Sequence, residues 1–258
     1  MMNIASDARP EGFRPEGFYI GHEPAAPVTR RFMAKVAAGV IASAFALALA
    51  LGFAVQEPGK GGYGADLTAQ GVLQNVPYPV LRIAPSADHP KGRALLVAGD
   101  GKIGAGEAVE TLKGQVIEAT GNMLKRGDLD MMIVDTSTFK PVASAAPPKL
   151  AEAVPLGKWR IAGEICDGKC YAGAMRPGTG LAHKACANLC ITGGQAAILA
   201  TSKPVEGASF LLLANADGSL PPARMYDLVA LPVELEGELF RLDDLLIFRV
   251  NWQSAKTL

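Results

Sequence analysis

The stretch 228–250, LVALPVELEGELFRLDDLLIFRV, decides the fold, because an earlier stretch, 112–134, LKGQVIEATGNMLKRGDLDMMIV, has the same pattern. The two align without a gap at an offset of 116 residues, so that Gly121 corresponds to Gly237 and the apolar positions coincide. Self-similarity at a fixed offset predicts a duplicated structural unit. The alternative is a pair of unrelated hairpins that share a strand pattern.

Each copy has the pattern of a β-hairpin. In the first copy, apolar residues alternate with polar ones up to Met123, a polar turn follows at 125–128, and a second apolar strand begins at Leu129. A glycine in the middle of a strand, such as Gly121, marks a bulge or a barrel corner. Other apolar runs predict strands at 78–83, 94–98, 159–165, 196–200 and 209–213.

Short, bent strands in two units are typical of small closed barrels. The 29 glycines and 18 prolines also favour many turns over a helix bundle. We therefore predict a mainly β protein, with one N-terminal transmembrane helix followed by two OB-like small β-barrel units. A Gly-rich tether, 56–65, precedes the first unit, 66–137, and a Pro- and Ala-rich linker, 138–152, separates it from the second unit, 153–258.

The segment 36–55 is an uncharged apolar run of twenty residues, long enough as a helix to span about 30 Å of hydrocarbon. Arg30, Arg31 and Lys35 precede it, and positive charge stays on the cytoplasmic side. We predict an uncleaved single-pass anchor at 32–55 in a bacterial inner membrane, because the run is long for a cleaved signal peptide. The C-terminal body would then be periplasmic.

The residues before the anchor, 1–31, contain a direct repeat, RPEGF, at 9–13 and 14–18. Pro10 and Pro15 forbid a continuous helix, so we predict an extended cytoplasmic tail. We expect the aromatic residues of this tail to make apolar contacts with a membrane partner.

The charge balance argues against a nucleic-acid partner. Lys plus Arg and Asp plus Glu number 25 each, for a formal net charge of +0, whereas nucleic-acid binders carry a basic stripe. The expected partners are the membrane and other protein subunits of a membrane complex.

One cluster of residues carries the chemistry: Cys166, Cys170, His183, Cys186 and Cys190, within 25 residues of the second unit. A helix through 183–190 would place His183, Cys186 and Cys190 on one face. Cys170 would complete a tetrahedron of three thiolates and one imidazole, with Cys166 as a spare ligand. This spacing predicts a metal ion or an iron–sulfur centre.

Disulfides are the alternative, since exported domains with an even number of cysteines usually pair them and would then need no cofactor. Free thiols are a third possibility. If the ion were copper, Met175 could add a thioether ligand. The spacing also excludes a c-type haem, which needs Cys-x-x-Cys-His.

Other motifs point to no catalysis. The segment 99–104 matches G-x-G-x-x-G, but Gly106 and Gly114 interrupt the long helix that a dinucleotide site needs, so a turn is the better interpretation. Asp128, Asp130, Asp243 and Asp244 are predicted turn residues and not a catalytic carboxylate pair. We single out no catalytic residues and expect no catalytic activity of the chain's own.

Three resemblances add to this. The flank 29–35, TRRFMAK, resembles a twin-arginine export signal, although Met33 and Ala34 stand where Phe and Leu are commonest. The layout of arginine pair, anchor, glycine tether and exported β domain resembles a Rieske-type iron–sulfur subunit. A Rieske cluster takes two histidines, and His22 and His89 lie far from the cysteines, so its chemistry is not carried over.

The segments 163–170, GEICDGKC, and 183–190, HKACANLC, resemble a group of uncharacterised bacterial exported domains. These have D-x-x-C followed by H-x-x-C-A-x-x-C and then a small barrel. The resemblance covers the C-terminal part of the chain and brings no established activity. It favours Cys170, Cys186 and Cys190 over Cys166.

From these features we predict a membrane-anchored periplasmic accessory or electron-transfer subunit of a membrane redox complex. One alternative is a disulfide-stapled structural or assembly subunit with no metal. Another is a metal-dependent periplasmic enzyme, which would need an open coordination position and an acid or base.

Overall fold

A computed structural model describes residues 27–54, 59–142 and 148–258. The chain divides into an N-terminal unit, Met1–Glu57, and a body, Pro58–Leu258. Most of the predicted tail, 1–31, lies outside the described residues, as does the start of the predicted tether.

The N-terminal unit contains one helix, α1 (Pro27–Ala54). Its stretch Val28–Gly52 is long enough to cross a membrane, and an 18-residue window within it has a mean hydropathy of 2.0. A signal sequence near the N-terminus meets the same criteria. The predicted apolar helix is confirmed, and it begins at a proline, a residue favoured in the first turn of a helix.

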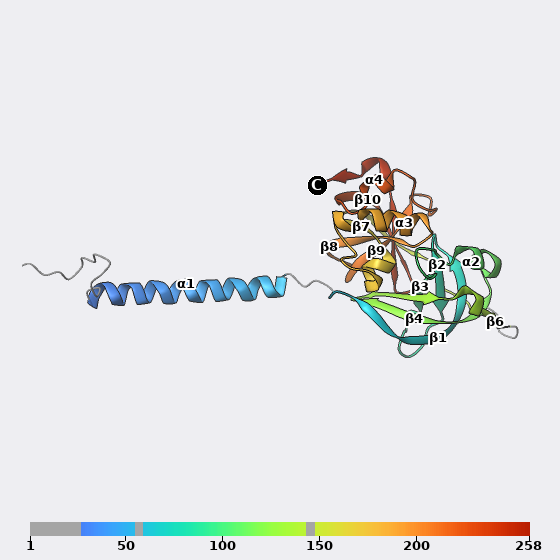
Figure 1. The fold of residues 1–258 in the computed structure, drawn as a ribbon, viewed down its shortest axis with the longest axis horizontal. Coiled ribbons are helices and arrows are strands. Elements are labelled where there is room, and N and C mark those ends of the chain that lie inside the picture. Colours follow the sequence, from blue (N-terminus) through green and yellow to red (C-terminus); the bar gives the residue numbers. More distant parts are fainter. Residues whose placement is uncertain (1–26, 55–58, 143–147) are drawn as a thin grey trace, which may run out of the picture. The chain divides into compact units, whose positions relative to one another are not determined.

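The first barrel of the body is a ring of five strands (Figure 1). Around the ring the order is β1-β2-β3-β5-β4, and β4 pairs with β1 to close it; β3 and β5 are parallel. A short helix, α2 (Gly106–Leu112), connects β3 to β4, and β6 (Lys140–Pro141) adds to β4. The five strands are β1 (Gly62–Asn75), β2 (Pro79–Ile83), β3 (Arg93–Ala98), β4 (Val116–Arg126) and β5 (Leu129–Val134).

The second barrel has the same ring. Its order is β7-β8-β9-β11-β10, closed by the pairing of β10 with β7, with α4 (Met225–Leu228) before β10 and β12 (Lys256–Thr257) added to it. The five strands are β7 (Val154–Asp167), β8 (Ala197–Val205), β9 (Ala208–Asn215), β10 (Pro232–Leu242) and β11 (Leu245–Val250). The prediction of a mainly β protein with two OB-like barrels is confirmed.

The repeat read from the sequence corresponds to equivalent hairpins in the two barrels. Gly121 pairs with Val134, and Gly237 pairs with Val250, at the same offset of 116 residues. The parallel pairings and the short added strands also keep this offset. The two barrels therefore share register as well as topology.

The mid-strand glycines are required by close strand contacts. A Cβ atom on Gly121 would lie 2.1 Å from the carbonyl oxygen of Ile133, and one on Gly237 would lie 2.2 Å from that of Arg249. No side chain fits at such a distance, so each glycine lets its strand bend across the barrel.

Strands extend into both predicted connectors. β1 begins at Gly62, inside the predicted tether 56–65, because its first residues pair with β4. The predicted linker 138–152 contains β6, which also pairs with β4. Strand pairing overrides the Gly- and Pro-rich composition at both places.

A shared apolar core joins the two barrels. Val80, Leu96 and Met131 of the first barrel belong to the same buried cluster as the core of the second. At the edge of this contact, Arg82 makes a two-point ion pair with Asp243, at 2.7 and 2.8 Å, and both side chains are 4% exposed. The body is therefore one compact unit.

The two hairpin turns dock reciprocally. Asp128, in the turn between β4 and β5, accepts hydrogen bonds from the backbone amide and hydroxyl of Ser209 at the start of β9. Asp244, in the turn between β10 and β11, accepts one from the backbone amide of Ala94 in β3, at 2.6 Å. Asp128 and Asp244 thus lie in turns, as predicted, and also bind each barrel to the other. The same prediction was wrong for Asp130, which lies in β5 and pairs with Lys125 of β4.

Candidate metal site

The cysteine-rich segment is the connection between the first two strands of the second barrel. In the first barrel this connection is short, 76–78, whereas in the second it runs over 168–196. It contains a turn of π-helix, η2 (Cys170–Ala174), a 3-10 turn, η3 (Leu181–His183), and α3 (Lys184–Thr192). Gly193 and Gly194 end α3.

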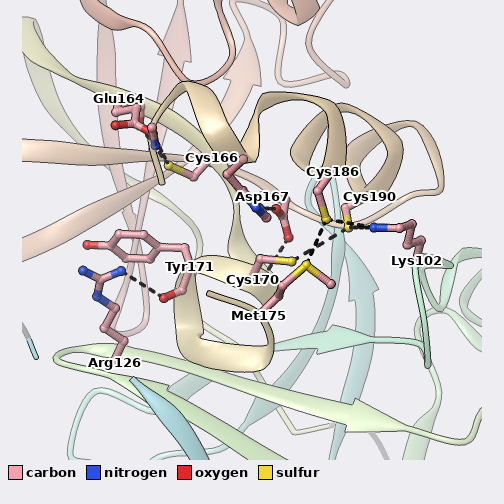
Figure 2. Close-up of polar contacts among 12 residues, drawn as sticks. Lys102, Arg126, Glu164, Cys166, Asp167, Cys170, Tyr171, Met175, Cys186 and Cys190 are labelled. Carbon is pink, nitrogen blue, oxygen red and sulfur yellow. Dashed lines mark hydrogen bonds and ion pairs between the residues drawn. The ribbon is translucent and has the colours of Figure 1, made fainter. Parts of the chain in front are cut away.

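The structure brings Cys170, His183, Cys186 and Cys190 together. η2 supplies Cys170, and η3 ends at His183. α3 places Cys186 and Cys190 one turn apart, and Figure 2 shows both facing Cys170. Cys170, His183 and Cys190 are 2–4% exposed, and Cys186 is half-buried. The predicted helix is confirmed for 184–190, whereas His183 is the last residue of the 3-10 turn that precedes it.

Their ligand atoms are close enough to hold a metal ion. Those of Cys170, His183 and Cys186 all lie within 4.8 Å of one another, and so do those of Asp167, Cys170 and Cys190. The Sγ atoms of Cys170 and Cys190 are 4.0 Å apart. A zinc–thiolate bond of about 2.3 Å separates two sulfur ligands of a tetrahedron by about 3.8 Å, so this spacing fits a shared ion.

Asp167 orients two of these residues. Its Oδ2 lies 2.9 Å from Nε2 of His183, and its Oδ1 accepts a hydrogen bond from the backbone amide of Cys170, at 2.8 Å. Because Nε2 of His183 contacts Asp167, Nδ1 is the ring nitrogen left to bind a metal. Metal-binding histidines commonly have their second nitrogen fixed by a carboxylate in this way. Sequence analysis did not assign a role to Asp167, although the D-x-x-C segment contains it.

Cys166 lies apart from the other three sulfurs. Its Sγ is 3.4 Å from Oε1 of Glu164, and Figure 2 shows it turned toward that side chain. Successive residues of a strand point to opposite faces, so Cys166 and Asp167 at the end of β7 diverge. Burial raises the pKa of the Cys166 thiol. The structure therefore places Cys166 outside the cluster.

Two further side chains contact Cys186. The Cys186 thiol donates to Sδ of Met175, at 3.3 Å. Nζ of Lys102 lies 2.8 Å from Sγ of Cys186 and 3.7 Å from Sγ of Cys190. Lys102 belongs to the first barrel, 84 residues before Cys186, and no local pattern in the sequence could have indicated it.

Cys170 and Cys190 affect each other's pKa. A hydrogen bond from Cys170 lowers the pKa of Cys190 to about 7, and the charge of Lys102 contributes to this. The same hydrogen bond, together with burial, raises the pKa of Cys170. The pKa of Lys102 is raised by its bond to Cys186. Cys190 is therefore the sulfur of the pair that ionises first. All four cysteines are free thiols.

The G-x-G-x-x-G segment, 99–104, is a loop that docks on the second barrel. Lys169 donates to the carbonyl oxygens of Gly99 and Gly101, at 2.6 and 2.9 Å, and Gln195 donates to that of Ile103, at 2.8 Å. The helix that follows, α2, spans only seven residues. This loop is a contact between the barrels, with Lys102 at its tip.

No family model matches the chain, and neither a curated protein nor a solved structure is detectably similar to it. The function is therefore argued from the geometry of the site.

Proposed function

We propose that the chain is a membrane-anchored periplasmic accessory or electron-transfer subunit of a membrane redox complex. In this proposal Cys170, His183, Cys186 and Cys190 bind one metal ion. The observation that carries it is a pair of overlapping ligand groups that share Cys170: one adds His183 and Cys186, and the other adds Asp167 and Cys190. Asp167 also fixes the imidazole of His183. Thiolate and imidazole ligands favour zinc, iron and copper over hard cations such as magnesium.

Burial of the ligands favours a closed site. A catalytic metal keeps an open position for water or substrate, whereas structural and electron-transfer sites do not need one. Cys170, His183 and Cys190 are almost fully enclosed, and the half-buried Cys186 is contacted by Met175 and Lys102. This supports an accessory or electron-transfer role over a metal-dependent enzyme.

The N-terminal unit supports attachment to a membrane. α1 has the length and hydropathy of a membrane span, and Arg30, Arg31 and Lys35 lie in its first turns. Cations stay on the cytoplasmic side, which would place the body in the periplasm of a bacterial inner membrane. A subunit held there would meet its partner subunits within or beside the bilayer.

The test is elemental analysis with an optical spectrum of the detergent-purified full chain, compared with Cys186→Ser and with Cys166→Ser as the matched control. We expect stoichiometric metal in the wild type and in Cys166→Ser, and loss of metal in Cys186→Ser. Iron or copper with visible bands would indicate electron transfer, and colourless zinc would indicate an accessory role. A metal-free wild type, after purification without chelator, would refute the metal site.

A second candidate is the disulfide-stapled structural or assembly subunit. It is favoured by the 4.0 Å between the Sγ atoms of Cys170 and Cys190, which a small movement would bring to the bonding distance of about 2.05 Å. Thiol counting under non-reducing conditions separates the two candidates. The metal-binding protein has four thiols after unfolding in chelator, and the disulfide-bonded protein has fewer.

A further inference from the structure

The candidate metal site lies in the second barrel, but the first barrel reaches it. The loop 99–104 leaves the end of β3 and extends Lys102 to the sulfurs of Cys186 and Cys190 (Figure 2). Nearby, Arg126 of β4 donates to the carbonyl oxygen of Tyr171 in η2 and stacks on its ring, 4.0 Å from the centroid. Two elements of the first barrel therefore contact the segment that holds the cluster.

We infer that the metal centre is a two-barrel site, in which Lys102 is a positioning residue that binds the thiolate of Cys186 and offsets the charge of the metal complex. This inference rests on the proposed function, because it concerns the same ion. It adds that the second barrel alone does not complete the site.

The position of Lys102 is fixed by its loop. Lys169 and Gln195 hold the loop through their bonds to its carbonyl oxygens, and both side chains are buried. The backbone amide of Gly104 also donates to the carbonyl oxygen of Gly193, at 2.8 Å. The loop is therefore attached to both ends of the cysteine segment, beside Cys170 and after α3.

Glycines make this attachment close. A Cβ atom on Gly193 would lie 2.0 Å from the carbonyl oxygen of Lys102, and one on Gly104 would lie 2.3 Å from that of Gly194. The two backbones meet where no side chain fits, as in other close backbone contacts. The backbone position of Lys102 is thus fixed by its contact with the end of α3.

The negative charges of the site require cations nearby. In a metal complex, Cys170, Cys186 and Cys190 are thiolates, and with the carboxylate of Asp167 they carry four negative charges. A divalent ion offsets two of these. A buried net charge is costly, so the remaining two need partners.

Lys102 and Lys169 supply two positive charges at this place. Lys102 binds Cys186 directly, and Lys169, which is 5% exposed, directly precedes Cys170 in the chain and donates to the carbonyl oxygens of Gly99 and Gly101. A hydrogen bond from an ammonium to a metal-bound thiolate also withdraws electron density from the sulfur and is a charge-assisted contact. The site is therefore matched to a divalent ion of borderline softness.

The test is a titration of the metal-free full chain in detergent with Co²⁺, whose sulfur-to-metal charge-transfer bands report thiolate ligation. Lys102→Met removes both charge and donor, Lys102→Arg keeps both, and Lys91→Met is the control, because Lys91 is an exposed lysine in another loop of the first barrel. We expect Lys102→Met to weaken Co²⁺ binding about 10- to 100-fold and to move the charge-transfer band to lower energy. Lys102→Arg should recover most of both, and Lys91→Met should match the wild type.

The outcomes separate this inference from the proposed function. If the wild type binds Co²⁺ through thiolates and Lys102→Met binds it equally well with the same spectrum, the two-barrel site is wrong while the metal site stands. If the wild type gives no thiolate bands, the proposed function itself fails. Equal loss in Lys102→Met and Lys102→Arg, with unchanged thermal unfolding, would also overturn the charge-compensating role.

Discussion

The two barrels have one topology and one register, and they differ most at one connection. Between the first two strands the first barrel has three residues, 76–78, and the second has the segment 168–196 with the cysteine cluster. The mid-strand glycines, the parallel strand pair and the reciprocal turn contacts are common to both. The candidate function thus belongs to an insertion in one barrel and not to the barrel fold.

The same comparison shows what the first barrel contributes. Its hairpin turn and β3 take part in the reciprocal contacts, and the loop 99–104 holds Lys102 against the cluster. The first barrel, which has no cluster of its own among the described residues, therefore supports the site of the second.

The largest effect is expected at the ion pair that joins the barrels. Arg82→Met leaves Asp243 buried without its cation, which should lower the free energy of unfolding by about 3–5 kcal/mol. Guanidinium unfolding followed by tryptophan fluorescence measures this. The control, Arg160→Met, loses an exposed pair with Glu236 and should cost less than about 1 kcal/mol. Similar small losses in both variants would mean that the barrels do not depend on this pair.

A smaller effect tests the equivalence of the two barrels. Gly121→Ala and Gly237→Ala each force a methyl group against a backbone oxygen, so each should lose about 1–3 kcal/mol of stability. Thermal unfolding of both variants gives the comparison. Gly106→Ala is the control, because a Cβ atom there meets no atom within 4 Å. Tolerance at one of the two strand glycines would show that the barrels are bent differently.

Local patterns in the sequence were sufficient for most of the strands and most of the cluster, but they did not predict β1. Alternating apolar residues and the repeated glycine predicted the hairpins, because strand period and close backbone contact are local properties. Cys170, His183, Cys186 and Cys190 lie within a short segment, so spacing alone indicated that they meet. The extent of the tether was predicted less well, because the pairing of β1 with β4 depends on distant residues.

The rest of the site required the tertiary structure. Lys102 comes from the other barrel, and its approach to Cys186 depends on how the barrels pack. Asp167 is three residues from Cys170, but its contact with His183 depends on the path of the segment between them. Cys166 differs from its neighbour only by the side of the strand on which it lies.

The orientation of the imidazole gives the next prediction. Asp167→Asn removes the negative charge beside Nε2 of His183 and should weaken Co²⁺ binding about 10- to 100-fold. The Co²⁺ titration measures this, with Cys166→Ser as a variant that keeps the wild-type affinity. Unchanged binding in Asp167→Asn would mean that the segment holds His183 in place without the carboxylate.

The smallest effect concerns the thiols of the chelator-treated chain. The hydrogen bond from Cys170, with the charge of Lys102, holds the pKa of Cys190 at about 7, whereas burial raises the pKa of Cys166. Because the pKa of Cys190 is lowered, its thiolate forms as the pH rises through neutrality, while Cys166 stays protonated. The ultraviolet absorbance of thiolates should therefore rise in a first step near pH 7.

Three variants identify that step. Cys190→Ser should abolish it, because the ionising sulfur is removed, and Cys166→Ser should leave it unchanged. Lys102→Met should move it to higher pH, because a cation that favours the thiolate is lost. If the first step instead occurs at the ordinary pKa of a thiol, Cys170 and Cys190 do not share a proton. The segment 168–196 would then differ from the connection 76–78 in length but not in the chemistry that we assign to it.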